Sequence, residues 1–112
     1  MQPPQVVEAC HQCLKWLIPQ LDTFPRNRRF TLGERIESNL LDTLTHTTQA
    51  VYTPKIKLQL LVKANQHCAV VRHLWRLCYE LKVIDKKRYQ YGSEIIVDIG
   101  RQIGGWTRQC QR

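Results

Sequence analysis

Residues 89–112 read YQYGSEIIVDIGRQIGGWTRQCQR and carry the clearest structural pattern in the chain. Apolar and small residues recur there at steps of three and four, at Tyr89, Gly92, Ile96, Ile99, Ile103, Trp106 and Cys110. This spacing places them on one face of an α-helix, so it predicts a helix that packs lengthwise against other helices. Arg101 and Arg108 lie two turns apart, on a face away from the centre of that seam.

Three glycines interrupt the same helix, at Gly100, Gly104 and Gly105. Each of them costs about 1 kcal/mol relative to alanine in a helix interior. A cluster of such penalties indicates a surface that a neighbour approaches closely. We therefore expect the three glycines and Trp106 to form a packing or oligomer contact.

The rest of the chain shows three more helical patterns, over residues 5–24, 31–52 and 53–82. The apolar face of 31–52 is predicted to consist of Ile36, Leu40, Leu44 and Val51. No segment sustains the period-two alternation of a strand. Four amphipathic helices with short connections predict an all-α fold, an antiparallel up-down-up-down four-helix bundle in one domain, 1–112.

Polar residues and prolines mark the expected helix ends. Thr31, with Glu34 three residues later, has the spacing of a capping box. Pro54 suits the first turn of a helix, because its missing N–H would have no partner there. Asp85 is expected to cap the last helix, and Pro19 to kink the first.

The 112 residues carry 17 Lys and Arg against 9 Asp and Glu, a net charge of +8. A domain this basic commonly binds a polyanion, nucleic acid first, with an anionic membrane or an acidic protein as alternatives. A membrane-surface protein would carry most of the charge on one helix, whereas all four share it here. We expect no signal peptide and no membrane span. Five cysteines, an odd number, indicate reduced thiols and a cytoplasmic protein.

The segment Cys10-His11-Gln12-Cys13 has the spacing of half a zinc site. A structural zinc site needs four ligands, and no second pair is present in the sequence. Cys10 and Cys13 also fall on the apolar face of helix 5–24, so we expect them in the core, with no metal and no other cofactor. Scattered carboxylates without a nucleophile elbow or phosphate loop indicate a binding protein rather than an enzyme.

Arg72 and Arg76 lie one turn apart on the shoulder of the apolar face of helix 53–82. Their stems can rest on the edge of the core while the guanidinium groups present a fork to phosphate, carboxylate or carbonyl groups. The alternatives are a solvated flank or ion pairs within the chain, with Asp42, Glu80 or Asp98.

Two further basic clusters are predicted at opposite ends of helix 31–52. They are Arg26, Arg28 and Arg29 before it, and Lys55, Lys57 and Lys63 after it. Charge spread in this way favours sequence-independent contact with nucleic-acid phosphates. The three tryptophans fall on or beside helical seams and are expected in packing contacts, whereas Tyr91, close to Lys86, Lys87 and Arg88, could touch RNA.

Three sequence blocks together resemble one family. They are FPR at 24–26 with LGERI at 32–36, RHLWRL at 72–77, and IGRQIGGW at 99–106. In this order and spacing they resemble the four-helix-bundle family of Avd, the accessory variability determinant of diversity-generating retroelements. Ribosomal-RNA intervening-sequence proteins are its structural relatives. The resemblance covers nearly the whole chain, and the last block is its most specific part.

The resemblance implies a function. Avd proteins are not enzymes; they form barrel-like homo-pentamers and associate with the retroelement's reverse transcriptase and its template RNA during mutagenic cDNA synthesis. By resemblance, partner contact is expected first at Arg72 and Arg76. The other residues that we expect to bind the partner are Arg101, Arg108, Arg26 and Arg35. The residues expected on the RNA backbone are Arg28, Arg29, Lys55, Lys57 and Lys63. The alternative is an intervening-sequence-type bundle, a basic nucleic-acid- or protein-binding module of undefined role.

Overall fold

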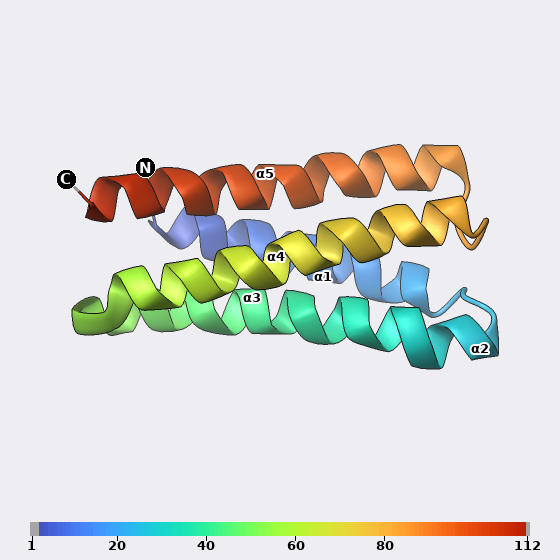
Figure 1. The fold of residues 1–112 in the computed structure, drawn as a ribbon, viewed down its shortest axis with the longest axis horizontal. Coiled ribbons are helices and arrows are strands. Elements are labelled where there is room, and N and C mark those ends of the chain that lie inside the picture. The colour runs from blue at the N-terminus through green and yellow to red at the C-terminus, as the bar shows by residue number, and fades with distance from the viewer. Residues whose placement is uncertain (1–2, 112) are drawn as a thin grey trace.

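The computed structural model describes residues 3–111, which fold into helices joined by short turns. The elements are α1 (Pro3–Leu21), α2 (Arg26–Arg28), the π-helical turn η1 (Arg29–Gly33), α3 (Glu34–Tyr52), the 3-10 turn η2 (Pro54–Ile56), α4 (Lys57–Glu80) and α5 (Lys86–Cys110). Residues 26–52 form one nearly continuous helix, so four long helices run alternately up and down (Figure 1). No strand occurs within 3–111, and the predicted all-α four-helix bundle is confirmed.

The core lies between the four long helices, with α3 packed on α1 and α4, and α5 packed on α4 and α1. Trp75 of α4 is fully buried, and its indole N–H donates to the backbone oxygen of Tyr89 at 3.1 Å. Gly92 makes room for that ring, because a Cβ at position 92 would lie 2.5 Å from Trp75 Nε1. The predicted seam of α5 is confirmed: its buried residues are Gly92, Ile96, Ile99, Ile103 and Trp106.

The buried face of α3 differs from the predicted one in its second half. Thr43 and Thr47 are fully buried, whereas Leu44 and Val51 are only half-buried. Each threonine hydroxyl donates to the carbonyl oxygen one turn earlier, at 2.9 Å. A hydroxyl satisfied by its own helix leaves no unpaired polar group, so these threonines can be buried among apolar side chains.

The start of the last helix is as predicted. Asp85 Oδ1 accepts a hydrogen bond from the backbone N–H of Arg88 at 2.8 Å, so Asp85 caps α5. Pro54 likewise lies in the first turn of η2, where no N–H is needed.

The predicted cap at Thr31 is wrong. Thr31 lies inside η1, and its hydroxyl donates to the backbone oxygen of Asn27 at 2.7 Å. The helix has already begun at Arg26, directly after Pro25, whose ψ of 148° is extended. Because proline disfavours helix before it and fits the position at which a helix starts, the helix begins one turn earlier than the capping-box spacing suggested.

The helices also differ from the expected lengths at their ends. α1 continues through Pro19 and ends at Leu21, earlier than the expected end at Phe24. α4 and α5 contain 24 and 25 residues, but polar side chains occur along both. Within residues 3–111, no helix combines the length and the apolar character needed to cross a bilayer.

Candidate partner-binding surface

Arg72 of α4 and Arg101 of α5 line the same cleft between these two helices. The cleft has a volume of about 340 Å³ and includes the small residues Cys68, Ala69 and Gly100 in its lining. A Cβ at Gly100 would lie 3.8 Å from Cys68 Sγ, an ordinary contact distance. Small side chains therefore leave a hollow between α4 and α5, with an arginine contributed by each helix. We call it the arginine cleft.

The charges of the arginine cleft are largely unopposed. No ion pair within residues 3–111 involves Arg72. Arg101 Nη1 lies 3.7 Å from Asp98 Oδ1, but the two side chains are 72% and 51% exposed, so water screens the pair. Burial raises the pKa of Cys68 to about 11 although the charge of Arg72 lowers it, so that thiol is neutral at pH 7. The cleft can therefore accept an anionic group.

The other two arginines of the same helices have different surroundings. Arg76 donates to Glu80 at 3.2 Å, which is one of the ion pairs named as an alternative. Arg108 is exposed, and its Nη1 would lie 3.6 Å from a Cβ at Gly104. The structure thus associates Arg72 with Arg101 of the neighbouring helix, and not with Arg76 alone.

The glycines of α5 have two different roles. Gly100, Gly104 and Gly105 are half-buried, and the first two have no contact in the protomer that excludes a Cβ. The close approach inside the protomer occurs at Gly92 instead, against Trp75. Trp106 is 2% exposed and packs in the core, with Lys57 Nζ 5.7 Å from the centroid of its ring. An oligomer contact at the three glycines stays a prediction.

The segments before and after α3, which carry these basic residues, lie at opposite ends of the bundle (Figure 1), so the two clusters are separated as expected. Those that are exposed are Arg26, Arg35, Lys55 and Lys63, and those that are half-buried are Arg28, Arg29 and Lys57. Arg29 donates to Asp22 Oδ1 at 3.3 Å and to Glu37 Oε1 at 2.9 Å. Contact between Arg29 and RNA, which stays a prediction, would compete with these two bonds. Arg26 lies 5.9 Å from the centroid of the Phe30 ring.

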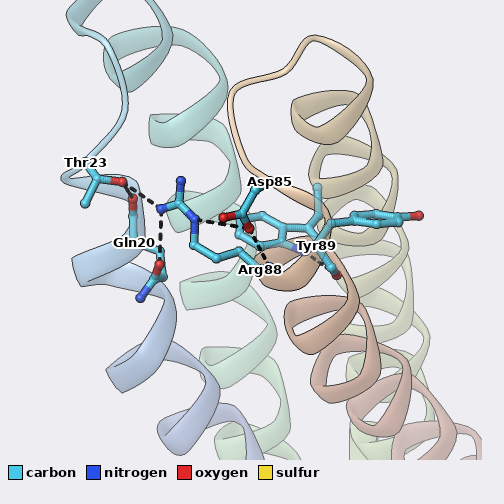
Figure 2. Close-up of polar contacts among 6 residues, drawn as sticks. Gln20, Thr23, Asp85, Arg88 and Tyr89 are labelled. Atoms are coloured by element: carbon cyan, nitrogen blue, oxygen red, sulfur yellow. Dashed lines mark hydrogen bonds and ion pairs between the residues drawn. The ribbon is translucent and has the colours of Figure 1, made fainter.

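Sequence reasoning missed the structural role of Arg88. Figure 2 shows its guanidinium between the end of α1 and the start of α5. Arg88 Nη1 donates to Gln20 Oε1 at 3.3 Å and to Thr23 Oγ1 at 3.0 Å, while its Nε lies 3.9 Å from Asp85 Oδ1. Arg88 therefore joins the two helices at this end of the bundle. No sequence signal could reveal this, because Gln20 and Thr23 are remote in the chain.

Cys10 and Cys13 lie in the core, as predicted. Burial raises the pKa of each thiol to about 12, so both are protonated at neutral pH. A thiolate is the form that ligates metals, so this environment opposes metal binding. Within residues 3–111, no three His, Cys, Asp or Glu side chains gather in a way that could hold a metal ion.

Comparison with known proteins identifies the family. The family described as bAvd-like matches residues 6–110 of the 112, from α1 to the end of α5. No curated protein and no solved structure matches the chain. The matched range includes the arginine cleft and all three sequence blocks that resemble Avd. The chain therefore belongs to the bAvd-like family, and its resemblance to Avd proteins is confirmed.

Proposed function

We propose that this protein is a non-enzymatic accessory subunit of a diversity-generating retroelement, and that it acts in the cytoplasm. In this role it binds the reverse transcriptase and its template RNA and supports mutagenic cDNA synthesis. Membership of the bAvd-like family supports the accessory role. The observation that carries the binding role is the arginine cleft, where Arg72 and Arg101 present guanidinium groups from two different helices.

Partner binding by the arginine cleft follows from guanidinium chemistry. A planar guanidinium donates two parallel hydrogen bonds to a phosphate or a carboxylate, and it stays charged at all physiological pH values. Arg72 and Arg101 stand on rigid helices, which reduces the conformational entropy lost on binding. The exposed basic residues at both ends of α3 add contacts to RNA phosphates that do not depend on base sequence.

We propose that the protein assembles into a homo-pentamer, with the stoichiometry taken from the resemblance to Avd and the contact supported by the outward face of α4. Four large apolar side chains of α4 and Leu81, directly after its end, are between 38% and 45% exposed; the four are Leu58, Val62, Val70 and Leu77. Extensive apolar surface on a helix commonly marks a protein–protein contact. Five protomers of charge +8 carry +40, so the assembly favours an anionic partner that offsets this self-repulsion.

Co-purification tests the proposal. The protein is expressed with an affinity tag beside a retroelement reverse transcriptase and its non-coding RNA, and both are measured in the eluate. We expect both to co-purify with the parent chain. The variant Arg72→Ala/Arg101→Ala should retain its helical content and weaken association by about 2–4 kcal/mol, because such arginines act as interface hot spots.

The matched control is Lys86→Ala/Lys87→Ala, which removes the same charge from exposed positions outside the arginine cleft. It should bind nearly as well as the parent and differ mainly in salt dependence. Equal losses in both variants would mean that net charge, and not the cleft, controls binding. Failure of the parent itself to retain reverse transcriptase and RNA would remove the proposed function and favour an intervening-sequence-type role.

A further inference from the structure

A second hollow lies on the other flank of α5, between α5 and α1. It is an open groove of about 610 Å³, within the size range of ligand-binding sites. Its apolar lining consists partly of two small residues of α1, Ala9 and Cys13, and of the larger Ile95 of α5. The groove and the arginine cleft share no lining residue, although Asp98 of the groove lies 3.7 Å from Arg101 of the cleft.

Two aromatic rings form part of the groove. The Trp16 and Tyr91 rings lie 4.8 Å apart between centroids, inclined at 51°. Trp16 also packs edge-on against the buried Trp75, with 5.9 Å between centroids, so its position is fixed by the core. Tyr91 is 52% exposed. The protein thus holds an aromatic surface in contact with solvent, although a hydrophobic side chain this exposed gains little from folding alone.

Two carboxylates from α5 line the same groove. Glu94 and Asp98 lie one turn apart, where like charges repel each other. Asp98 accepts a hydrogen bond from Gln102 Nε2 at 2.7 Å, and its other oxygen is 3.7 Å from Arg101 Nη1. Glu94 has no hydrogen bond or ion pair through its side chain within residues 3–111. The two carboxylates outnumber the one lysine of the groove, Lys15, so the groove is locally acidic in a chain of charge +8.

We propose that the groove binds an arginine side chain of a protein partner. A guanidinium can stack flat on an aromatic ring, which the exposed Tyr91 provides with Trp16 packed behind it, and can form a forked hydrogen bond with a carboxylate, which Glu94 provides. An RNA segment fits less well, because its phosphates are repelled by Glu94 and Asp98. Lys15 also lines the groove and opposes a cationic guest, so its removal should tighten binding.

The probe is a peptide with both termini capped, acetyl-Gly-Ala-Arg-Ala-Gly-amide. The control is the same peptide with citrulline in place of arginine, because citrulline has nearly the shape of arginine without its charge. Binding is followed by NMR through the indole N–H signals of Trp16, Trp75 and Trp106 in the full-length protein. We expect the arginine peptide to shift the Trp16 signal and to leave Trp106 in place. The citrulline peptide should bind several-fold more weakly.

Three single variants test the named groups. Glu94→Gln and Tyr91→Leu should each lower the affinity for the arginine peptide by about two- to fivefold, which is the range for one exposed ion pair or cation–π contact. Lys15→Gln should raise the affinity for the same peptide by a similar factor. The matched control is Glu34→Gln, an exposed carboxylate of α3 outside the groove, which should leave the affinity unchanged.

Four results would overturn the inference. The first is no shift of Trp16 at millimolar peptide, and the second is equal binding of the arginine and citrulline peptides. The third is a larger Trp16 shift with a short single-stranded RNA than with the peptide, which would make the aromatic pair a base-stacking surface. The fourth is a Trp16 shift that follows protein concentration alone, because a second copy would then fill the groove.

Discussion

Adding one methyl group at Gly92 should destabilise the protein, although alanine favours a helix. The Cβ of Gly92→Ala would lie 2.5 Å from Trp75 Nε1 and 2.6 Å from Trp75 Cε2. Trp75 is fully buried and donates a hydrogen bond to Tyr89, so moving the ring would disturb its packing and strain that bond. Overpacking a core costs about 1–3 kcal/mol, and straining the indole hydrogen bond adds about 1 kcal/mol. The helix-propensity gain of about 1 kcal/mol offsets part of this, leaving a net loss of about 2 kcal/mol.

The matched control is Gly100→Ala in the same helix. Its Cβ would lie 3.8 Å from Cys68 Sγ, so no overpacking opposes the gain in helix propensity. We expect Gly100→Ala to stabilise the protomer by up to about 1 kcal/mol. Urea unfolding followed by circular dichroism, at one fixed protein concentration, measures both variants. If Gly92→Ala were as stable as the parent, the assigned packing of Trp75 against α5 would be wrong.

Three smaller predictions concern caps, ion pairs and pH. Asp85→Ala should lower the free energy of unfolding by about 1 kcal/mol, because Asp85 caps α5. Thr31→Ala should change it by less than about 0.5 kcal/mol, because Thr31 is not a cap. Equal losses of the two variants in urea unfolding would contradict this. Arg29→Ala should cost about 1 kcal/mol, measured in the same assay, and no loss would mean that its two ion pairs are only surface contacts. Burial raises the pKa of Cys10 and Cys13 from 9.0 to about 12, so above pH 9 the unfolded chain loses these protons first and stability falls as pH rises. The fall in urea midpoint from about pH 8 to about pH 10.5 should therefore be smaller in Cys10→Ala/Cys13→Ala than in the parent; identical falls would refute it.

The fold could be predicted from the sequence because helical periodicity is local. The seam of α5, the burial of Cys10 and Cys13, and the cap at Asp85 all follow from residues within a few turns of one another. Thr43 and Thr47 could not be assigned to the core in this way, since their burial depends on hydroxyl hydrogen bonds that the apolar pattern does not reveal. Thr31 failed as a cap because Pro25, outside the capping-box spacing, starts the helix earlier.

The candidate site was only partly predictable, because it depends on how the helices are aligned with one another. The spacing of Arg72 and Arg76 along one helix suggested that these two act together. The structure instead places Arg72 beside Arg101, since α4 and α5 are neighbours and small residues leave a hollow between them. The need for glycine at position 92 likewise depends on Trp75, which comes from another helix.

Reconstituted cDNA synthesis tests the central claim most directly. Purified reverse transcriptase and its template RNA are incubated with deoxynucleotides, with or without this protein, and the cDNA is measured and sequenced. We expect template-length cDNA that carries substitutions to require the protein. The variant Arg72→Ala/Arg101→Ala should reduce the cDNA yield in parallel with its loss of binding. Equal yield and equal substitution frequency with and without the protein would contradict the role as an accessory subunit.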